Sequence, residues 1–125
     1  MIAEAEAALS EVPADHIVAG WTDAGQRRLR FWSAGCSTGE EPYTVAMILR
    51  EALHDPAWWK VLIRGTDICT RTLVQARKGL YGKRTVAHME PGFRDRYMTR
   101  KGDRYLLAPE IRQAVQFRYF NLACD

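Results

Sequence analysis

The stretch "RFWSAGCSTGEEPY" at residues 30–43 joins an apolar run to two glycines and two glutamates. The apolar run stops at Gly35, as a buried strand does, and apolar residues recur at helical spacing after Pro42. A strand, a glycine turn and a helix in this order are typical of ligand-binding α/β sheets. The stretch therefore predicts an α/β fold with a ligand site at the turn.

The rest of the chain extends this pattern. Strands are expected at 29–34, 59–67 and 115–122, and helices from about 40 to 54 and from 70 to 79. Strands that alternate with helices favour a parallel sheet with right-handed crossovers. We therefore expect a partial Rossmann-like α/β domain with three parallel strands. Ser37 or Thr38 is expected to cap the first helix, Thr70 to cap the second, and Gly79 to close it.

The domain organisation follows from where the alternation fails. A chain of 125 residues is long enough for one core. Residues 1–28 are expected to form an N-terminal helix and a connection, and residues 29–125 the partial domain. Residues 82–114 interrupt the alternation and hold a Gly-Asp turn between short apolar pieces, so an insertion with a small β-hairpin is expected there.

Composition bounds the class of protein. Hydrophobic residues make up 47% and charged residues 26%, which is globular composition. No apolar run approaches the roughly 20 residues that cross a bilayer, and the acidic start lacks the basic residues of a signal peptide. The expected location is cytoplasmic, without membrane insertion. The cysteines Cys36, Cys69 and Cys124 have no CxxC spacing, so we expect neither disulfides nor a metal site.

The net charge of +3 conceals an asymmetry. Residues 1–60 carry five basic and nine acidic side chains, a net −4, whereas residues 71–104 carry ten and three, a net +7. A basic segment can attract nucleic acid, an acidic protein surface or anionic lipid, or can simply be a solvated face. Charge alone leaves these alternatives open.

The acids beside the turn indicate the charge of the ligand. Gly35 and Gly39 would let the backbone approach a ligand closely, although they could merely make a tight turn. Glu40 and Glu41 would repel a phosphate at the start of this helix, and the spacing fails the G-x-G-x-x-G fingerprint. A cationic nucleoside without phosphate, such as S-adenosylmethionine, is favoured instead. The alternative is that the acids only complement the helix dipole.

Two further polar residues follow the second and third predicted strands. Asp67 could accept both ribose hydroxyls, as an acid at this position does in nucleotide-binding folds, or could cap the next helix. Asn121 could hydrogen-bond an adenine edge, or simply end its strand. The carboxyl ends of the strands are therefore the predicted site.

The runs "FWSAGCSTGEEPYTVAMIL", "WWKVLIRGTDICTRTLVQARKGLY" and "VQFRYFNL" resemble the CheR-type chemotaxis-receptor glutamate methyltransferases over about residues 29–122. The resemblance implies an S-adenosylmethionine-dependent protein-glutamate O-methyltransferase acting on the cytoplasmic helices of chemoreceptors, with no nucleic acid partner. No general base is required, because a glutamate is already ionised at neutral pH, and the catalytic residues stay unassigned. Residues 82–114 match the small receptor-contacting β-subdomain of the family.

The resemblance also implies a set of cofactor contacts. Glu41 and Asp67 match acidic contacts, and the other matched positions are Ala34 and Gly35 on the glycine loop and Asn121 and Leu122 at the adenine.

Two features depart from the family pattern. The arginine-containing segment ahead of the first strand has no match in residues 1–28, and the fourth strand would begin just after Asp125. The chain therefore resembles the first half of a catalytic domain, and we expect an unpaired edge on the first strand that favours self-association. The alternatives are a non-catalytic nucleoside- or receptor-binding module, and a dehydrogenase half-domain, which the acids and glycine spacing disfavour.

Overall fold

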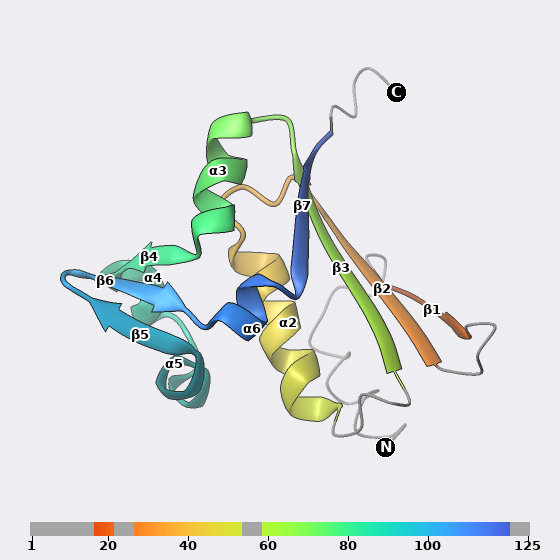
Figure 1. The fold of residues 1–125 in the computed structure, drawn as a ribbon, viewed down its shortest axis with the longest axis horizontal. Helices are drawn as coiled ribbons and strands as arrows, with labels where there is room; N and C mark the ends of the chain where they lie inside the picture. Colours follow the sequence, from red (N-terminus) through yellow and green to blue (C-terminus); the bar gives the residue numbers. More distant parts are fainter. Residues whose placement is uncertain (1–16, 22–26, 54–58, 121–125) are drawn as a thin grey trace.

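The computed structural model describes residues 17–21, 27–53 and 59–120. Its main sheet has the strand order β1-β2-β3-β7 (Figure 1). The strands are β1 (Ile17–Trp21), β2 (Arg27–Ala34), β3 (Trp59–Asp67) and β7 (Val115–Tyr119). Strands β2, β3 and β7 are parallel, whereas β1 runs antiparallel to β2. The prediction of a Rossmann-like sheet with three parallel strands is confirmed.

The helices of the main layer lie on one side of this sheet (Figure 1). They are α2 (Glu40–Ala52), α3 (Thr70–Lys78) and the short α6 (Pro109–Arg112). Helix α2 contacts β2, β3 and β7, and α3 contacts β3 and β7. Parallel strands need such crossover helices because each strand ends at the edge of the sheet opposite to the edge where the next strand begins.

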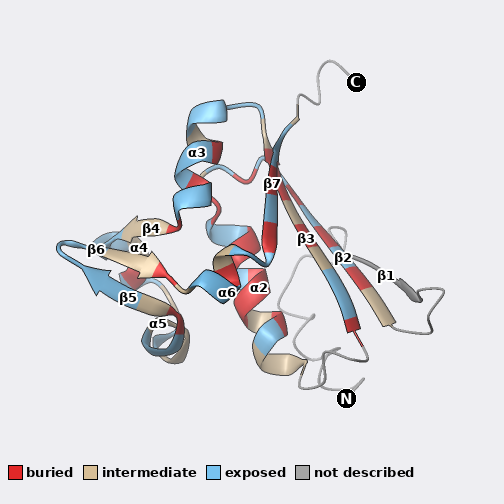
Figure 2. Cartoon of the chain, in the orientation of Figure 1, coloured by how far each residue is buried: buried red, intermediate tan, exposed pale blue. Residues whose placement is uncertain are grey.

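The core lies between the sheet and these helices. Leu29, Phe31 and Ser33 of β2 are buried, whereas Arg30 and Trp32 between them are exposed (Figure 2). This period of two places one face of the sheet against α2 and α3. Each large apolar side chain buried there stabilises the fold by about 1.5–3 kcal/mol. The helices contribute further fully buried side chains, which include Tyr43, Leu73 and Ile111.

A second, smaller sheet occupies the insertion. It has the antiparallel order β4-β6-β5, from strands β4 (Leu80–Gly82), β5 (Met98–Lys101) and β6 (Arg104–Leu107). The helices α4 (Lys83–Ala87) and α5 (Pro91–Tyr97) lie between β4 and β5 in the chain. The β5–β6 hairpin turns at Gly102, whose φ of 66° favours glycine. The predicted hairpin is present, and β4 extends it to three strands.

Polar contacts tie the small sheet to the main layer. The Leu107 amide donates to the Gly79 carbonyl at 2.8 Å, and the Tyr97 hydroxyl donates to the Glu51 carboxylate at 2.5 Å. Arg96 adds an ion pair to Glu51 at 3.2 Å. The Leu107 bond joins β6 to the end of α3, and the Tyr97 and Arg96 contacts join α5 to the last turn of α2, so the insertion packs against this layer.

The predicted open edge of the first parallel strand is wrong over most of its length. Backbone pairing runs from Ile17 opposite Phe31 to Trp21 opposite Arg27, so β1 occupies that edge. This strand could not be predicted from the sequence because its five residues include Gly20 and show no long alternation of apolar and polar residues. The expected basis for self-association is therefore absent along the paired residues.

Both predicted helix caps are also wrong. The N-cap of α2 is Gly39 and that of α3 is Cys69, and neither helix has a side-chain cap hydrogen bond. The prediction that Gly79 closes α3 is confirmed, with φ at 61°. The expected N-terminal helix lies outside the described residues. Within the part of the chain that the structure describes, no helix has the length and apolarity needed to cross a membrane.

Candidate cofactor site

The loop between β2 and α2 is held against the carboxyl end of β3. The amides of Gly35 and Cys36 both donate to the Thr66 carbonyl, at 2.8 and 2.9 Å. Positive φ values at Gly35 (71°), Ser37 (52°) and Gly39 (91°) turn the backbone sharply over these few residues. The loop is thus fixed at the sheet edge where ligands of open α/β sheets bind.

The two glycines of the loop have different surroundings. A Cβ on Gly39 would lie 3.1 Å from Ala76 Cβ and 3.1 Å from the Phe117 ring, so this glycine permits close packing of α2 on α3 and β7. A Cβ on Gly35 would meet nothing within 4 Å. Only Gly35 therefore presents bare backbone to open space, as a ligand-binding glycine does.

Asp67 joins the two loops that border the site. Its Oδ2 accepts the Ser37 amide at 2.8 Å, and its Oδ1 accepts the Cys69 amide at 2.9 Å. A carboxylate has about four lone-pair sites, so two backbone bonds leave room for further donors. The two roles predicted for Asp67 are thus compatible: it organises the start of α3 and can still accept hydrogen bonds from hydroxyl groups.

Glu41 and Glu40 are oriented by neighbouring hydroxyl groups. Ser33 is almost completely buried, and its hydroxyl donates to Glu41 Oε1 at 2.8 Å. The Thr38 hydroxyl donates to the Glu40 carboxylate. The Ser33 bond directs Glu41 back toward the end of β2, so that Glu41, Ala34 and Gly35 border the same loop.

The electrostatic effect of these acids is visible at Cys36. The pKa of this buried thiol is raised from 9.0 to about 11, first by burial and then by the negative charges of Asp67, Glu40 and Glu41. Among the described residues, no Lys or Arg forms an ion pair with Asp67 or Glu40. The loop is therefore a region of negative potential that favours a cation.

These residues fit S-adenosylmethionine. Its sulfonium and ammonium groups suit the negative loop, its ribose hydroxyls suit the remaining acceptor sites of Asp67, and it brings no phosphate to repel. The position that follows Phe120 is Asn121, and the Phe120 amide donates to the Asp67 carbonyl at 3.2 Å. Asn121 and Leu122 themselves lie outside the described residues, so their assignment stays a prediction.

Tyr81 is a contributor that sequence reasoning missed. This residue of β4 donates its hydroxyl to the Thr38 carbonyl in the loop at 2.6 Å, across 43 residues of chain. Its ring also lies edge-on to Tyr43 of α2, with centroids 6.3 Å apart. Burial raises the pKa of Tyr81, so it stays a neutral donor at physiological pH. No local sequence signal marks such a long-range contact.

An apolar groove of about 620 Å³ adjoins the loop between α2 and the small sheet. Methionine and aromatic side chains line much of it, including Met47, Met89, Phe93 and Met98. Glu40 borders the groove at the end near the loop, whereas Gly35 and Asp67 do not line it. The groove is therefore a neighbour of the candidate site and shares Glu40 with it.

Comparison with known proteins identifies the family of the chain. Residues 6–125 match the family model described as "CheR methyltransferase, SAM binding domain". A chemotaxis protein methyltransferase of Borreliella burgdorferi is 36% identical over 96 residues, which are 75% of this chain and 34% of the relative. Chemotaxis protein methyltransferase 2 of Pseudomonas aeruginosa is 40% identical over 102 residues, covering 77% of this chain and 35% of the relative.

A third relative, the probable biofilm formation methyltransferase WspC of Pseudomonas aeruginosa, is 39% identical over 98 residues, covering 78% of this chain and 23% of the relative. The chain thus spans about a quarter to a third of the length of these curated relatives. The family implies S-adenosylmethionine as the cofactor. The chain belongs to the CheR methyltransferase family, to its SAM-binding domain.

Proposed function

We propose that this chain binds S-adenosylmethionine for the methylation of glutamate side chains on the cytoplasmic helices of chemotaxis receptors. The observation that carries the proposal is the convergence of Asp67, Glu40 and Glu41 on one glycine loop, where burial and, after it, their charges raise the pKa of Cys36. A negative loop of this kind favours a cationic nucleoside over a nucleotide phosphate.

Bound S-adenosylmethionine supplies an electrophilic methyl group. The residues of this chain bind and orient it: Gly35 offers backbone, Asp67 offers acceptors for hydroxyl groups, and Glu41, positioned by Ser33, adds negative charge. A glutamate substrate is already a carboxylate at neutral pH, so it needs no general base. Alignment of the two reactants and exclusion of water are the remaining requirements.

The exposed basic side chains of the small sheet and α4 favour an acidic protein as the substrate. Lys83, Arg84, Arg100, Lys101 and Arg104 are exposed on its strands and on α4. Such a surface attracts acidic receptor helices over distances of about the Debye length, and added salt weakens the attraction. Tyr81 connects this sheet directly to the cofactor loop.

The test is methyl transfer from radiolabelled S-adenosylmethionine to a purified receptor cytoplasmic fragment. Methyl esters of carboxylates release volatile methanol in base, and this distinguishes them from side chains methylated on nitrogen. We expect base-labile label on a receptor with glutamates at its methylation sites, none on the glutamine version, and a large loss with Asp67→Asn. Cofactor binding without transfer would instead support the non-catalytic nucleoside- or receptor-binding module.

A further inference from the structure

The insertion contacts the cofactor loop through a tyrosine of its small sheet, Tyr81. The hydroxyl of this β4 residue donates to the Thr38 carbonyl at 2.6 Å. Its ring lies edge-on to the ring of Tyr43, which is buried and donates its own hydroxyl to the Ala76 carbonyl of α3 at 2.6 Å. Because Tyr43 is fixed by the main layer, the Tyr81 ring that packs on it has a defined position beside the loop.

Thr38 links Tyr81 to Glu40. The Thr38 hydroxyl donates to the Glu40 carboxylate, and the Thr44 hydroxyl donates to the Glu40 carbonyl at 2.7 Å. Glu40 and Tyr81 also line the same groove beside the loop. Loss of the Tyr81 hydroxyl would therefore release the backbone of Thr38, the residue whose side chain orients the Glu40 carboxylate.

The charge of Glu40 acts on its surroundings in the loop. Burial, then Asp67 and then Glu40 raise the pKa of Cys36, whereas burial, then Tyr43 and then Glu40 raise the pKa of Tyr81. S-adenosylmethionine differs from S-adenosylhomocysteine by a methyl group and by the positive charge on the sulfur. A carboxylate close to the loop favours the charged ligand over the neutral thioether, to an extent that depends on its position.

We propose that Tyr81 is a positioning residue that holds Thr38 and Glu40 in place, so that the insertion sets how strongly the loop prefers the sulfonium cofactor to its thioether product. This inference rests on the proposed binding of S-adenosylmethionine. A hydroxyl that only completed the packing between the small sheet and α2 would change the stability of the fold and would affect both ligands alike. The preference between the two ligands therefore distinguishes the two roles.

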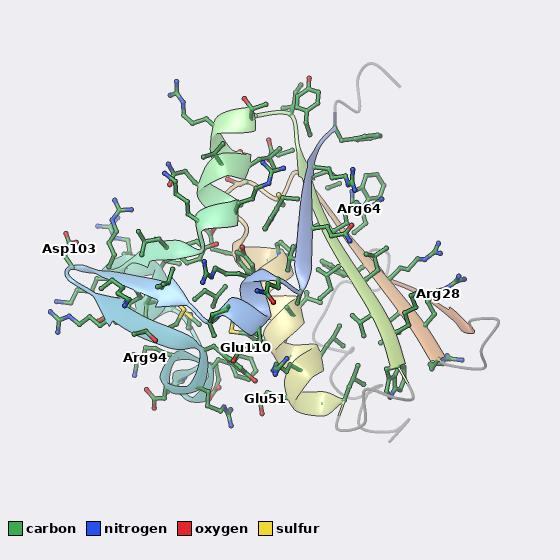
Figure 3. The ribbon with its side chains drawn as sticks, viewed as in Figure 1. Arg28, Glu51, Arg64, Arg94, Asp103 and Glu110 are labelled. Carbon is green, nitrogen blue, oxygen red and sulfur yellow. The ribbon has the colours of Figure 1, made fainter. Side chains whose placement is uncertain are left out.

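Tyr97 provides a matched control within the insertion. Its hydroxyl donates to the Glu51 carboxylate at 2.5 Å, which is another contact between the insertion and α2. Figure 3 shows Glu51 on the last turn of α2, at the end away from the loop, and this turn is about 16 Å from Glu40 along the helix axis. Tyr97→Phe thus removes a hydroxyl contact between the same two parts of the molecule, but at a distance from the cofactor loop.

The experiment is calorimetric titration of S-adenosylmethionine and of S-adenosylhomocysteine, separately, into the full chain and into variants that unfold cooperatively in urea. The measured quantity is the Kd of S-adenosylhomocysteine divided by the Kd of S-adenosylmethionine. We expect Glu40→Gln to lower this ratio about two- to fivefold, because one unit of charge is lost beside the loop. Tyr81→Phe should lower it about twofold, because the carboxylate is displaced but not removed.

Two further variants make the test specific. Thr38→Val removes the hydroxyl that orients Glu40 and should lower the ratio as Tyr81→Phe does, so it carries the same test if Tyr81→Phe does not fold. Tyr97→Phe should leave the ratio unchanged. In the Glu40→Gln background, Tyr81→Phe should have no further effect on the ratio, because the charge that it positions is gone.

Three results would overturn the inference: an equal loss of affinity for both ligands in Tyr81→Phe, a shift of the ratio as large in Tyr97→Phe, or independent effects of the Tyr81 and Glu40 substitutions. A folded wild-type chain that binds neither ligand would overturn the proposed function as well. Wild-type binding of both ligands, with an unchanged ratio in Tyr81→Phe, would overturn this inference alone.

Discussion

Replacing Gly35 and Gly39 separately by alanine should separate the packing role of the loop from its binding role. Both residues have positive φ, at 71° and 91°, so either alanine is strained by about 1–2 kcal/mol. Their surroundings differ. The new methyl group on residue 39 would lie 3.1 Å from both Ala76 and Phe117, and the one on residue 35 would meet nothing within 4 Å.

The expected magnitudes follow from these distances. Crowding of a packed region costs about 1–3 kcal/mol, so Gly39→Ala should lower the free energy of unfolding by about 2–5 kcal/mol. Gly35→Ala carries only the backbone strain and should lower it by about 1–2 kcal/mol. The order reverses for binding, since Gly35 is the glycine that faces open space. We expect Gly35→Ala to weaken S-adenosylhomocysteine binding about tenfold or more, which corresponds to about 1.4 kcal/mol.

The assay is urea unfolding followed by circular dichroism, paired with calorimetric titration of S-adenosylhomocysteine into each folded variant. Concentrations are corrected for the folded fraction, so that stability and affinity are measured separately. Equal destabilisation by the two variants would refute the close packing inferred at Gly39. Unchanged affinity in Gly35→Ala would refute the assignment of Gly35 to the ligand.

Three further outcomes are expected. Tyr81→Phe removes the bond to the Thr38 carbonyl and should lower the free energy of unfolding by about 0.5–1.5 kcal/mol while weakening cofactor binding; an affinity equal to wild type would argue against coupling of the small sheet to the loop. Ser33→Ala leaves Glu41 without its buried donor, and should weaken S-adenosylmethionine more than the uncharged-sulfur product in parallel titrations. Stability should fall above about pH 9, because the pKa of Cys36 is about 11 in the fold and 9.0 as a free thiol, so that the unfolded chain loses its proton first. Urea midpoints at pH 8 and pH 10 should show a smaller fall for Cys36→Ala, and an identical fall would contradict the burial of this thiol.

The central sheet could be predicted because its signals are local. Strands β2 and β3 end in small or polar residues, and each is followed by a helix with apolar residues at helical spacing, so the boundaries of β3 and the C-cap at Gly79 match expectation. Strand β1 and strand β4 were missed. Strand β4 has three residues and β1 has five, and both form only because a longer strand offers a free edge.

The location of the candidate site also follows from the sequence, since parallel strands bring their carboxyl ends together. The structure places Ala34, Gly35, Glu41 and Asp67 around one loop. Their individual bonds could not be read from the sequence. The Ser37 amide reaches Asp67 across 30 residues, and the Tyr81 hydroxyl reaches Thr38 across 43, so both contacts depend on how the elements pack.

The most direct test of the cofactor assignment is titration of S-adenosylhomocysteine into the 125-residue chain by calorimetry, beside Asp67→Asn. The variant keeps the size of the side chain, but removes its charge and one of its two acceptor oxygens. We expect saturable binding to the wild-type chain and at least a tenfold weaker affinity in a variant that still unfolds cooperatively in urea. A folded wild-type chain that binds no S-adenosylhomocysteine, or a variant that binds it equally well, would contradict the assignment of this loop to the cofactor.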